Sequence, residues 1–401
     1  MILYRIFAKL FFKNNFEFTD KKLTHTRFTV WFHAASAGEF EVLWPIVVKL
    51  NELNEFNFVL TTFSQSGLNS VKKCGALLEK NCLYAGLSPR EGGWLDALKA
   101  VGPKFFVSVK YEAWPDLWAS LSELKIPLHL INAKKRSSLV FINAVLKLLF
   151  MQCPNLYLYT AQKKEVEELE SLFKDAIVYR IGDPRWDRVY SRMHLQSEAF
   201  KKWLQNFIDQ KTPWAVMGSI WMSDLEYLES HSKTLELFLK QCATLWIFPH
   251  DLSSSNVTHI KNFLENRKIN CVTSLEYRLK GTKQFSSPKV IIVNEMGILT
   301  EFYKYSAWVY IGGGFEKGIH STIEPAVAGI PVISGSKREN QFYEVSLLEN
   351  EGQLLVLREP QDCKKIGDHL QRNNLKMDQS NLGAADRFLS KLKELGYIKW
   401  Q

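Results

Sequence analysis

Cysteine is scarce in this chain and follows no metal-binding pattern. The 401 residues contain 6 cysteines, with no Cys-x-x-Cys pair and no His/Cys cluster at the spacing of zinc ligands. This absence argues against a zinc finger and against a small scaffold held together by disulfides. We therefore expect reduced thiols in a cytosolic protein.

Long apolar runs are also missing. The first segment, MILYRIFAKLFFK, is interrupted by Arg5, Lys9 and Lys13, whereas a bilayer span needs about 20 apolar residues. No small-residue cleavage site marks a secretory signal. Because the cations recur every fourth residue, a helix over 1–13 would carry a cationic stripe beside a broad apolar face. Such a helix fits a membrane interface and fits equally a first helix packed on the protein.

Acidic metal motifs and nucleic-acid modules are absent too. No Asp-x-Asp follows a predicted strand, so a metal that bridges nucleotide phosphates has no obvious ligands, and we expect metal-independent chemistry. The 51 Lys and Arg against 42 Asp and Glu give a net charge of +9, which favours anionic partners such as phosphates, nucleotides or acidic lipid surfaces. Because the basic residues are dispersed, we expect no nucleic acid among the partners.

Short β-rich apolar runs alternate with segments long enough for a helix, a pattern typical of a parallel, doubly wound α/β sheet. A charged, strand-poor stretch at 188–212 divides them, and a last helix is expected around 381–395. The sequence therefore predicts two α/β domains, 1–200 and 201–401. The runs before the stretch are FTVWFHAA, NFVLTTF, KFFVSVKY, PLHLINA and NLYLYTA, and those after it are WAVMGSI, TLWIFPH, KVIIVNE, AWVYIGGG, IPVISGS and QLLVLRE.

The first of these strands ends on small residues followed by an acid. Residues 31–40 read WFHAASAGEF, so that Ser36, Ala37 and Gly38 precede Glu39. One interpretation is a strand-to-helix turn whose acid complements the helix dipole. The other is a catalytic base within reach of a substrate, because open α/β sheets bind ligands beyond the carboxyl ends of their strands. Position alone leaves both open.

The most specific turn runs from Ile311 to Pro331. Gly312–Gly314 follow a predicted strand, and the stretch STIE opens a helix. Glycines let the backbone approach a phosphate, and the helix N-terminus favours the anion. Glu324 can accept hydrogen bonds from a ribose or a base. Ser321 and Glu324 also have the spacing of a capping box, and a cap and a ligand contact can coexist.

Several segments resemble, in order, motifs of the 3-deoxy-D-manno-octulosonic acid (Kdo) transferases of lipopolysaccharide synthesis, over roughly residues 28–350. SAGEFE is similar to the family's Ser-x-Gly-Glu, TTFSQSG to Thr-Thr-x-Thr-x-Thr-Gly, and KYEAWPDLW to Glu-x-Glu-Leu-Trp-Pro-Asn. INAK, GDPRWDRV, EMGILTEFY and HSTIEPAVAGIPVISG match further motifs. The resemblance implies a GT-B fold, with two Rossmann-like domains facing a central cleft. Residues 1–200 would bind the acceptor and 201–401 the donor CMP-Kdo.

Carried over by position, the resemblance implies roles for individual residues. Glu39 would be the general base, and Glu112 and Arg185 would stabilise the transition state, Arg185 standing where the family usually has Lys. A surface ion pair between Arg185 and Asp187 is the structural alternative. CMP would be held by Pro249, His250, Met296, Gly297, Ile298, Ser321, Thr322, Ile323 and Glu324.

The donor segments also depart from the family pattern. The family has an Arg beside His250, a Glu at the position of Ile298 and an Asn at the position of Ser321. Its His-Glu-x-Glu stretch near Gly218 and Ser219 reads IWMSDLE here.

The resemblance further implies partners and a location. CMP-Kdo would donate Kdo, with inversion, to a bis-phosphorylated lipid A precursor (lipid IVA), without cofactor or metal, at the cytoplasmic face of the bacterial inner membrane. Residues 1–13 and the apolar stretch VFINAVLKLLFMQ, residues 140–152, would contact that membrane. Two alternatives remain, because fold alone does not fix the donor: a GT-B glycosyltransferase with a UDP-sugar or another acceptor, and a non-catalytic membrane-associated binding protein.

Overall fold

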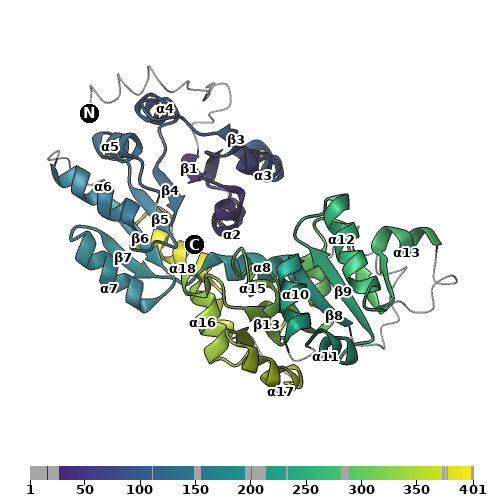
Figure 1. Cartoon of the computed structure of the whole chain (residues 1–401). Helices are drawn as coiled ribbons and strands as arrows, with labels where there is room; N and C mark the ends of the chain where they lie inside the picture. Colours follow the sequence, from purple (N-terminus) through teal and green to yellow (C-terminus); the bar gives the residue numbers. More distant parts are fainter. Residues whose placement is uncertain are drawn as a thin grey trace. The chain divides into compact units, whose positions relative to one another are not determined.

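The computed structural model describes residues 16, 27–110, 112–148, 155–194, 200, 214–231, 234–280, 289–372, 375 and 378–398. The chain forms two compact units, Met1–Arg188 with Gln379–Gln401, and Val189–Asp378 (Figure 1). The helix expected over 1–13 lies outside the described residues. Within them, no helix combines the length and the apolar character needed to cross a membrane.

The first unit is built on a 7-stranded parallel sheet of order β3-β2-β1-β4-β5-β6-β7. This is the doubly wound Rossmann order with one added strand, and the winding reverses between β1 and β4. Its strands are β1 (Phe28–Ala34), β2 (Phe56–Thr62), β3 (Cys82–Leu87), β4 (Phe105–Val109), β5 (Leu128–Ile131), β6 (Leu156–Thr160) and β7 (Ile177–Arg180).

Helices bury both faces of this sheet, which is why its central strands read as continuous apolar runs. Val30 and Phe32 pack toward α2, α3 and α18, whereas Trp31 packs toward α4, α5, α6 and α7. The helical elements are α2 (Ala37–Glu52), α3 (Gln65–Leu77), η2 (Glu79–Asn81), α4 (Trp94–Val101), α5 (Pro115–Glu123), α6 (Ser137–Leu148), α7 (Lys163–Leu172), α8 (Pro184–His194), η5 (Gln379–Asn381) and α18 (Ala384–Glu394).

The expected last helix forms as α18, but it packs in the first unit. Phe388 and Leu392 on its apolar face complete the core beside α2. The Asp187 carboxylate accepts hydrogen bonds from the backbone N–H groups of Gly383 (2.6 Å) and Ala385 (2.8 Å), which fixes the start of the helix. Our division at residue 200 had put this segment in the second domain. Its apolar face is instead buried by the first sheet's helices.

The second unit carries another 7-stranded parallel sheet, of order β10-β11-β9-β8-β12-β13-β14, whose winding reverses between β8 and β12. Its strands are β8 (Trp214–Ile220), β9 (Thr244–Pro249), β10 (Cys271–Thr273), β11 (Val290–Ile292), β12 (Ser306–Ile311), β13 (Val332–Gly335) and β14 (Leu354–Leu357). The helical elements are α10 (Met222–Ser230), α11 (Thr234–Lys240), α12 (Ser254–Glu265), α13 (Ser274–Lys280), α14 (Leu299–Tyr303), α15 (Ile323–Val327), η3 (Glu339–Gln341), α16 (Tyr343–Asn350), η4 (Pro360–Lys365) and α17 (Ile366–Leu370).

Every apolar run that predicted a strand forms one. The strands that the sequence did not predict are β3, β7 and β10, and each lies at the edge of its sheet. Edge strands β3 and β7 are mostly half-buried or exposed, so their sequences lack the continuous apolar run that a strand buried on both faces requires.

Candidate functional site

Glu39 and Glu112 follow the two strands between which the first sheet reverses its winding. Glu39 lies in the first turn of α2, directly after β1, and Glu112 lies between β4 and α5. Strands β1 and β4 pair in parallel, so the structure brings both acids to the same edge of the sheet. An open α/β sheet binds its ligands at this switch point. The two acids therefore stand where a ligand of the first unit is expected.

The Glu39 carboxylate lies among polar groups. Ser36 is the N-cap residue of α2 but makes no side-chain cap bond; its hydroxyl donates to Glu39 Oε2 at 3.3 Å. Lys110 Nζ lies 3.6 Å from Glu39 Oε1, and the Glu39 side chain is 13% exposed. Glu39 therefore stands in the first turn of a helix, as the dipole interpretation expects. Its carboxylate also has polar neighbours and is partly exposed, which suits a catalytic base.

Glu112 is a buried carboxyl group. The indole Nε1 of Trp114 donates to its Oε2 at 2.6 Å. Burial raises the pKa of Glu112 from 4.5 to about 7; the Trp114 bond and Lys110 oppose this rise, and the charge of Glu39 adds to it. Neighbouring acids in such different environments can take different roles in proton transfer.

Glu112 makes the stability of the first unit depend on pH. Because its pKa rises from 4.5 to about 7 on folding, its stabilising effect is fully present below pH about 4.5 and is lost as the pH rises through about 7. We expect Glu112→Gln to remove this dependence. The free energy of unfolding of the wild type relative to the variant should fall by about 2–3 kcal/mol from about pH 4.5 to about pH 8, as measured by urea unfolding. Glu123→Gln, at the exposed end of α5, is the control, and a constant difference would contradict the expectation.

An aromatic stack lies beside the two acids, and we did not predict it from the sequence. Phe63, after β2, stacks on Trp114 with ring centroids 5.2 Å apart, and the Arg90 guanidinium lies 4.3 Å from the Phe63 ring centroid. The stack holds Trp114, and through it the indole that binds Glu112. Phe63 lies in the motif TTFSQSG and Trp114 in the motif KYEAWPDLW. Their positions in these motifs were the sequence signal that could have identified the stack.

Arg185 lies on the same sheet edge but is not among the described contacts of Glu39 or Glu112. It follows β7, and its Nε (2.9 Å) and NH2 (2.7 Å) bind Oδ2 of buried Asp183. Burial opposes ionisation of Asp183, yet the bonds from Arg185 and Asn132 outweigh it and lower the pKa of that carboxyl. The Asp187 carboxylate of the alternative ion pair binds the start of α18, and that alternative stays a prediction.

In the second unit the glycine loop follows β12, at the other switch point. Gly313 has a φ of +84°, and a Cβ there would lie 2.4 Å from the carbonyl oxygen of Gly318. A Cβ on Gly314 would lie 2.5 Å from the Cα of Gly335. Only glycine fits these close backbone approaches, so the loop is tight, as expected. Gly312–Gly314 are buried, however, and the N–H groups of Gly312 and Gly313 already donate to Gly218 O and Asp224 Oδ2.

Asp224, in the first turn of α10, anchors this loop. Its fully buried carboxylate accepts from Gly313 N (2.9 Å), Trp221 N (2.9 Å) and the Tyr310 hydroxyl (3.1 Å). Burial raises the pKa of Asp224 to about 6, although these hydrogen bonds favour the carboxylate. Asp224 lies in the segment IWMSDLE, which the sequence marked only as a departure from the family pattern.

His250 belongs to a cluster of rings formed with Trp221 and His320. The His250 ring centroid lies 4.6 Å from that of Trp221 and 4.6 Å from that of His320. Trp221 Nε1 donates to His320 Nε2 at 3.3 Å, so the His320 ring accepts at this nitrogen. Burial lowers the pKa of His320 to about 4, and His250 adds to this effect. Lys317 lies 5.5 Å from the Trp221 ring.

The other predicted donor residues occupy the same edge of the second sheet. Pro249 ends β9 and is buried. Met296 is 86% exposed, Gly297 has a φ of +87°, and Ile298 is buried as the N-cap residue of α14. In this turn Met296 is therefore exposed to solvent, whereas Ile298, which stands in the position of the family's Glu, is buried.

The turn 321–324 differs from a capping box. Helix α15 begins at Ile323, and its N-cap residue is Thr322, without a side-chain cap bond. Ser321 is exposed. The Glu324 Oε2 accepts from the Thr300 hydroxyl at 3.1 Å, which joins α15 to α14. The box suggested by the spacing of Ser321 and Glu324 does not form, because Thr322 ends the non-helical turn one residue later.

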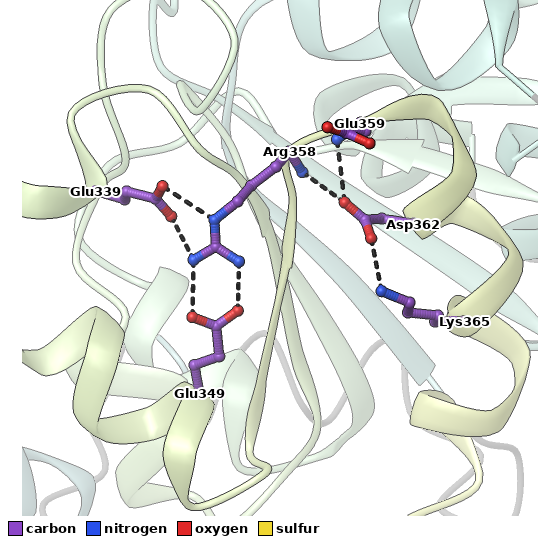
Figure 2. A network of polar contacts seen from close by, with 6 residues as sticks. All are labelled: Glu339, Glu349, Arg358, Glu359, Asp362 and Lys365. Carbon is purple, nitrogen blue, oxygen red and sulfur yellow. Dashed lines mark hydrogen bonds and ion pairs between the residues drawn. The ribbon is translucent and has the colours of Figure 1, made fainter.

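A network of ion pairs stabilises the segment after β13 (Figure 2). Arg358, after β14, binds both oxygens of Glu349 (2.6 and 2.7 Å) and contacts Glu339 (2.8 Å). Just before Glu339, the N–H of Lys337 donates to Gly314 O at 2.7 Å. The network therefore fixes the segment around Glu339, whose neighbour Lys337 contacts the glycine loop.

Within the described part of the chain, no group of three or more His, Cys, Asp or Glu side chains is arranged to hold a metal ion. Metal independence stays a prediction.

Sequence comparison relates the chain to Kdo transferases. A family model described as 3-Deoxy-D-manno-octulosonic-acid transferase (kdotransferase) matches residues 11–188. The 3-deoxy-D-manno-octulosonic acid transferase of Aquifex aeolicus is 27% identical over 390 residues, which cover 94% of this chain and 96% of that protein. That of Chlamydophila psittaci is 23% identical over 336 residues, or 81% of this chain and 73% of that protein.

Solved structures establish the fold. The UDP-GlcNAc 2-epimerase from Methanocaldococcus jannaschii has a TM-score of 0.62 at 13% identity and covers 91% of this chain and 99% of that one. Acinetobacter baumannii MurG has a TM-score of 0.52 at 9% identity, covering 92% and 99%. With the two parallel sheets, these likenesses define a two-domain, Rossmann-like GT-B fold. The chain is similar to Kdo transferases over most of its length, and it is a glycosyltransferase enzyme.

Proposed function

We propose that this enzyme transfers Kdo from CMP-Kdo to a sugar hydroxyl of a lipid A precursor, with inversion at the anomeric carbon. The observation that supports this proposal is the pair of unlike acids, Glu39 and Glu112, at the switch point of the first sheet in a chain similar to Kdo transferases. A glycosyltransferase needs a base that accepts the proton of the attacking hydroxyl. It also needs charged side chains that stabilise the opposite charges developing in the transition state.

Glu39 is the general base of the proposed reaction. Its carboxylate takes the hydroxyl proton as the acceptor oxygen forms a bond to the anomeric carbon and the bond from that carbon to the phosphate oxygen breaks. Attack opposite the leaving CMP inverts the configuration. Ionised Glu112 offsets the positive charge that develops at the sugar, and Arg185, held by Asp183, meets the negative charge of the leaving phosphate.

The second unit holds CMP in this proposal. The backbone of the glycine loop approaches the phosphate, and Met296, Ser321 and Glu324 contact the nucleoside, with Pro249, His250, Gly297, Ile298, Thr322 and Ile323 shaping the pocket.

The test uses the purified full chain with CMP-Kdo, generated in situ, and a tetraacylated lipid A precursor, with UDP-GlcNAc as the competing donor. Product from CMP-Kdo alone supports the proposal, and NMR of the product gives the anomeric configuration. Transfer only from the UDP-sugar would assign a different donor. Binding of CMP-Kdo and lipid without turnover would favour a binding protein.

The apolar stretch expected at a membrane includes exposed side chains on α6. Val140 is 40% exposed and Phe141 is 60% exposed, and the exposed Lys135 and Arg136 precede them. Apolar side chains next to cations favour an anionic lipid surface. These features support a site at the cytoplasmic face of the inner membrane, where the acceptor lipid would be reached.

The double variant Val140→Ser/Phe141→Ser should bind vesicles of phosphatidylethanolamine and phosphatidylglycerol about tenfold more weakly, since it removes exposed apolar area worth about 1–2 kcal/mol of insertion. Co-sedimentation measures the binding. Leu77→Ser on α3, where Leu77 is 63% exposed, is the matched control. Equal loss from both variants would show that α6 is not the contact surface.

A further inference from the structure

Lys110 has an unusual backbone conformation at the candidate site. It directly follows β4 and has a φ of +58°, a left-handed geometry that costs a non-glycine residue about 1 kcal/mol or more. Its N–H donates to Ile131 O at 2.7 Å, which fixes this turn. The side chain is 32% exposed and places Nζ 3.6 Å from Glu39 Oε1. A strained residue held beside an acid is a candidate for a functional role.

Lys110 is the cation next to two acids on adjoining elements. It faces Glu39 on α2 and, from its own loop, lowers the pKa of Glu112, which Glu39 raises. Ser36 contributes a neutral hydroxyl to Glu39. Among neighbouring charges, Glu41 on α2 is paired with Arg188 on α8.

A second cation, Arg90 after β3, stacks on Phe63.

We propose that Lys110 is a positioning residue that holds the Glu39 carboxylate beside Glu112, ready to accept the proton of the acceptor hydroxyl. This inference rests on the proposed function of Glu39. Lys110 takes no part in the proton transfer: the hydroxyl proton moves to Glu39 while the new glycosidic bond forms and CMP departs. Without the ion pair between Lys110 Nζ and Glu39 Oε1, the carboxylate is no longer held in one place.

Separate measurement of kcat and KM tests this role. We expect Lys110→Met to lower kcat about tenfold with little change in KM, because the Glu39 carboxylate loses the ion pair that holds it. Lys110→Arg should restore kcat, since a guanidinium can make the same ion pair. Lys261→Met, which removes a lysine of similar exposure paired with Glu276, should leave both constants unchanged. An unchanged kcat in Lys110→Met overturns the proposal.

A second readout does not depend on activity. In protein with ¹³C-labelled glutamate, the NMR titration of Glu112, assigned with Glu112→Gln, should move above its wild-type midpoint in Lys110→Met, because Lys110 lowers the pKa of Glu112. If the wild type transfers no Kdo, the proposed function fails, and this titration still decides whether Lys110 acts on the acid next to Glu39. An unchanged Glu112 midpoint overturns the inference, as does a moved midpoint with an unchanged kcat.

Discussion

Glu39→Gln is expected to lower kcat for Kdo transfer by about 10²- to 10⁴-fold, because glutamine cannot accept the hydroxyl proton that the reaction removes. The amide is nearly isosteric with the carboxylate and keeps an oxygen for the Ser36 hydroxyl. The variant should therefore fold normally and bind both substrates. Single-turnover transfer of Kdo to the lipid A precursor, with CMP affinity measured separately, checks this result.

Glu52→Gln is the matched control for this prediction. Glu52 is the last residue of the same helix, α2, and is exposed, so its replacement should leave both stability and transfer near wild type. Rapid turnover by Glu39→Gln would remove this carboxylate from the mechanism. The acid would then serve only the helix dipole.

Asp224→Ala is expected to damage both the stability and the donor site of the second unit. It leaves the buried donors of Gly313, Trp221 and Tyr310 without their acceptor. An unsatisfied buried donor costs about 1–3 kcal/mol, so we expect a total loss of about 3–5 kcal/mol after relaxation. The melting temperature should fall by about 10 °C.

The same change should weaken CMP binding by at least about tenfold, since the glycine loop loses the anchor that fixes Gly313. Calorimetry with CMP at a temperature where the variant is folded measures this effect.

The control is Glu276→Ala. The Glu276 carboxylate also accepts from a backbone N–H at the start of its helix, that of Thr273, but it lies beside the edge strand β10. Its loss should cost about 1 kcal/mol and leave CMP affinity unchanged. Wild-type CMP affinity in Asp224→Ala would show that the loop keeps its form without this anchor.

Much of this architecture could be predicted from the sequence, and the omissions have physical causes. The central strands of both sheets were found because strands buried on both faces are apolar throughout. The edge strands β3 and β7 were missed because their side chains are mostly half-buried or exposed, and β10 was missed because it has only 3 residues. The final helix was predicted from its apolar pattern, but the unit in which it packs was not. An amphipathic pattern shows that one face of a helix is buried and does not identify the sheet that buries it.

At the site, the turns that follow strands could be predicted from residue type, whereas the hydrogen-bond and ion-pair partners of the site residues could not. Glu39, Glu112 and the glycine loop stand at strand ends, which the sequence reveals directly. That Arg185 binds Asp183, and that Asp187 binds the start of α18, depends on how these elements pack. That Glu324 accepts from Thr300 depends on α14, which is distant in sequence.

The sequence by itself determined the alternation of strands and helices, the turns that carry polar chemistry, and the resemblance to Kdo transferases, because each of these is written in local periodicity and residue type. Only the tertiary structure decided the environments of those residues. The cation next to Glu39, the burial that shifts Glu112 and the anchoring of the glycine loop by Asp224 all join residues from different elements. Their energies depend on distance and exposure, which folding alone establishes.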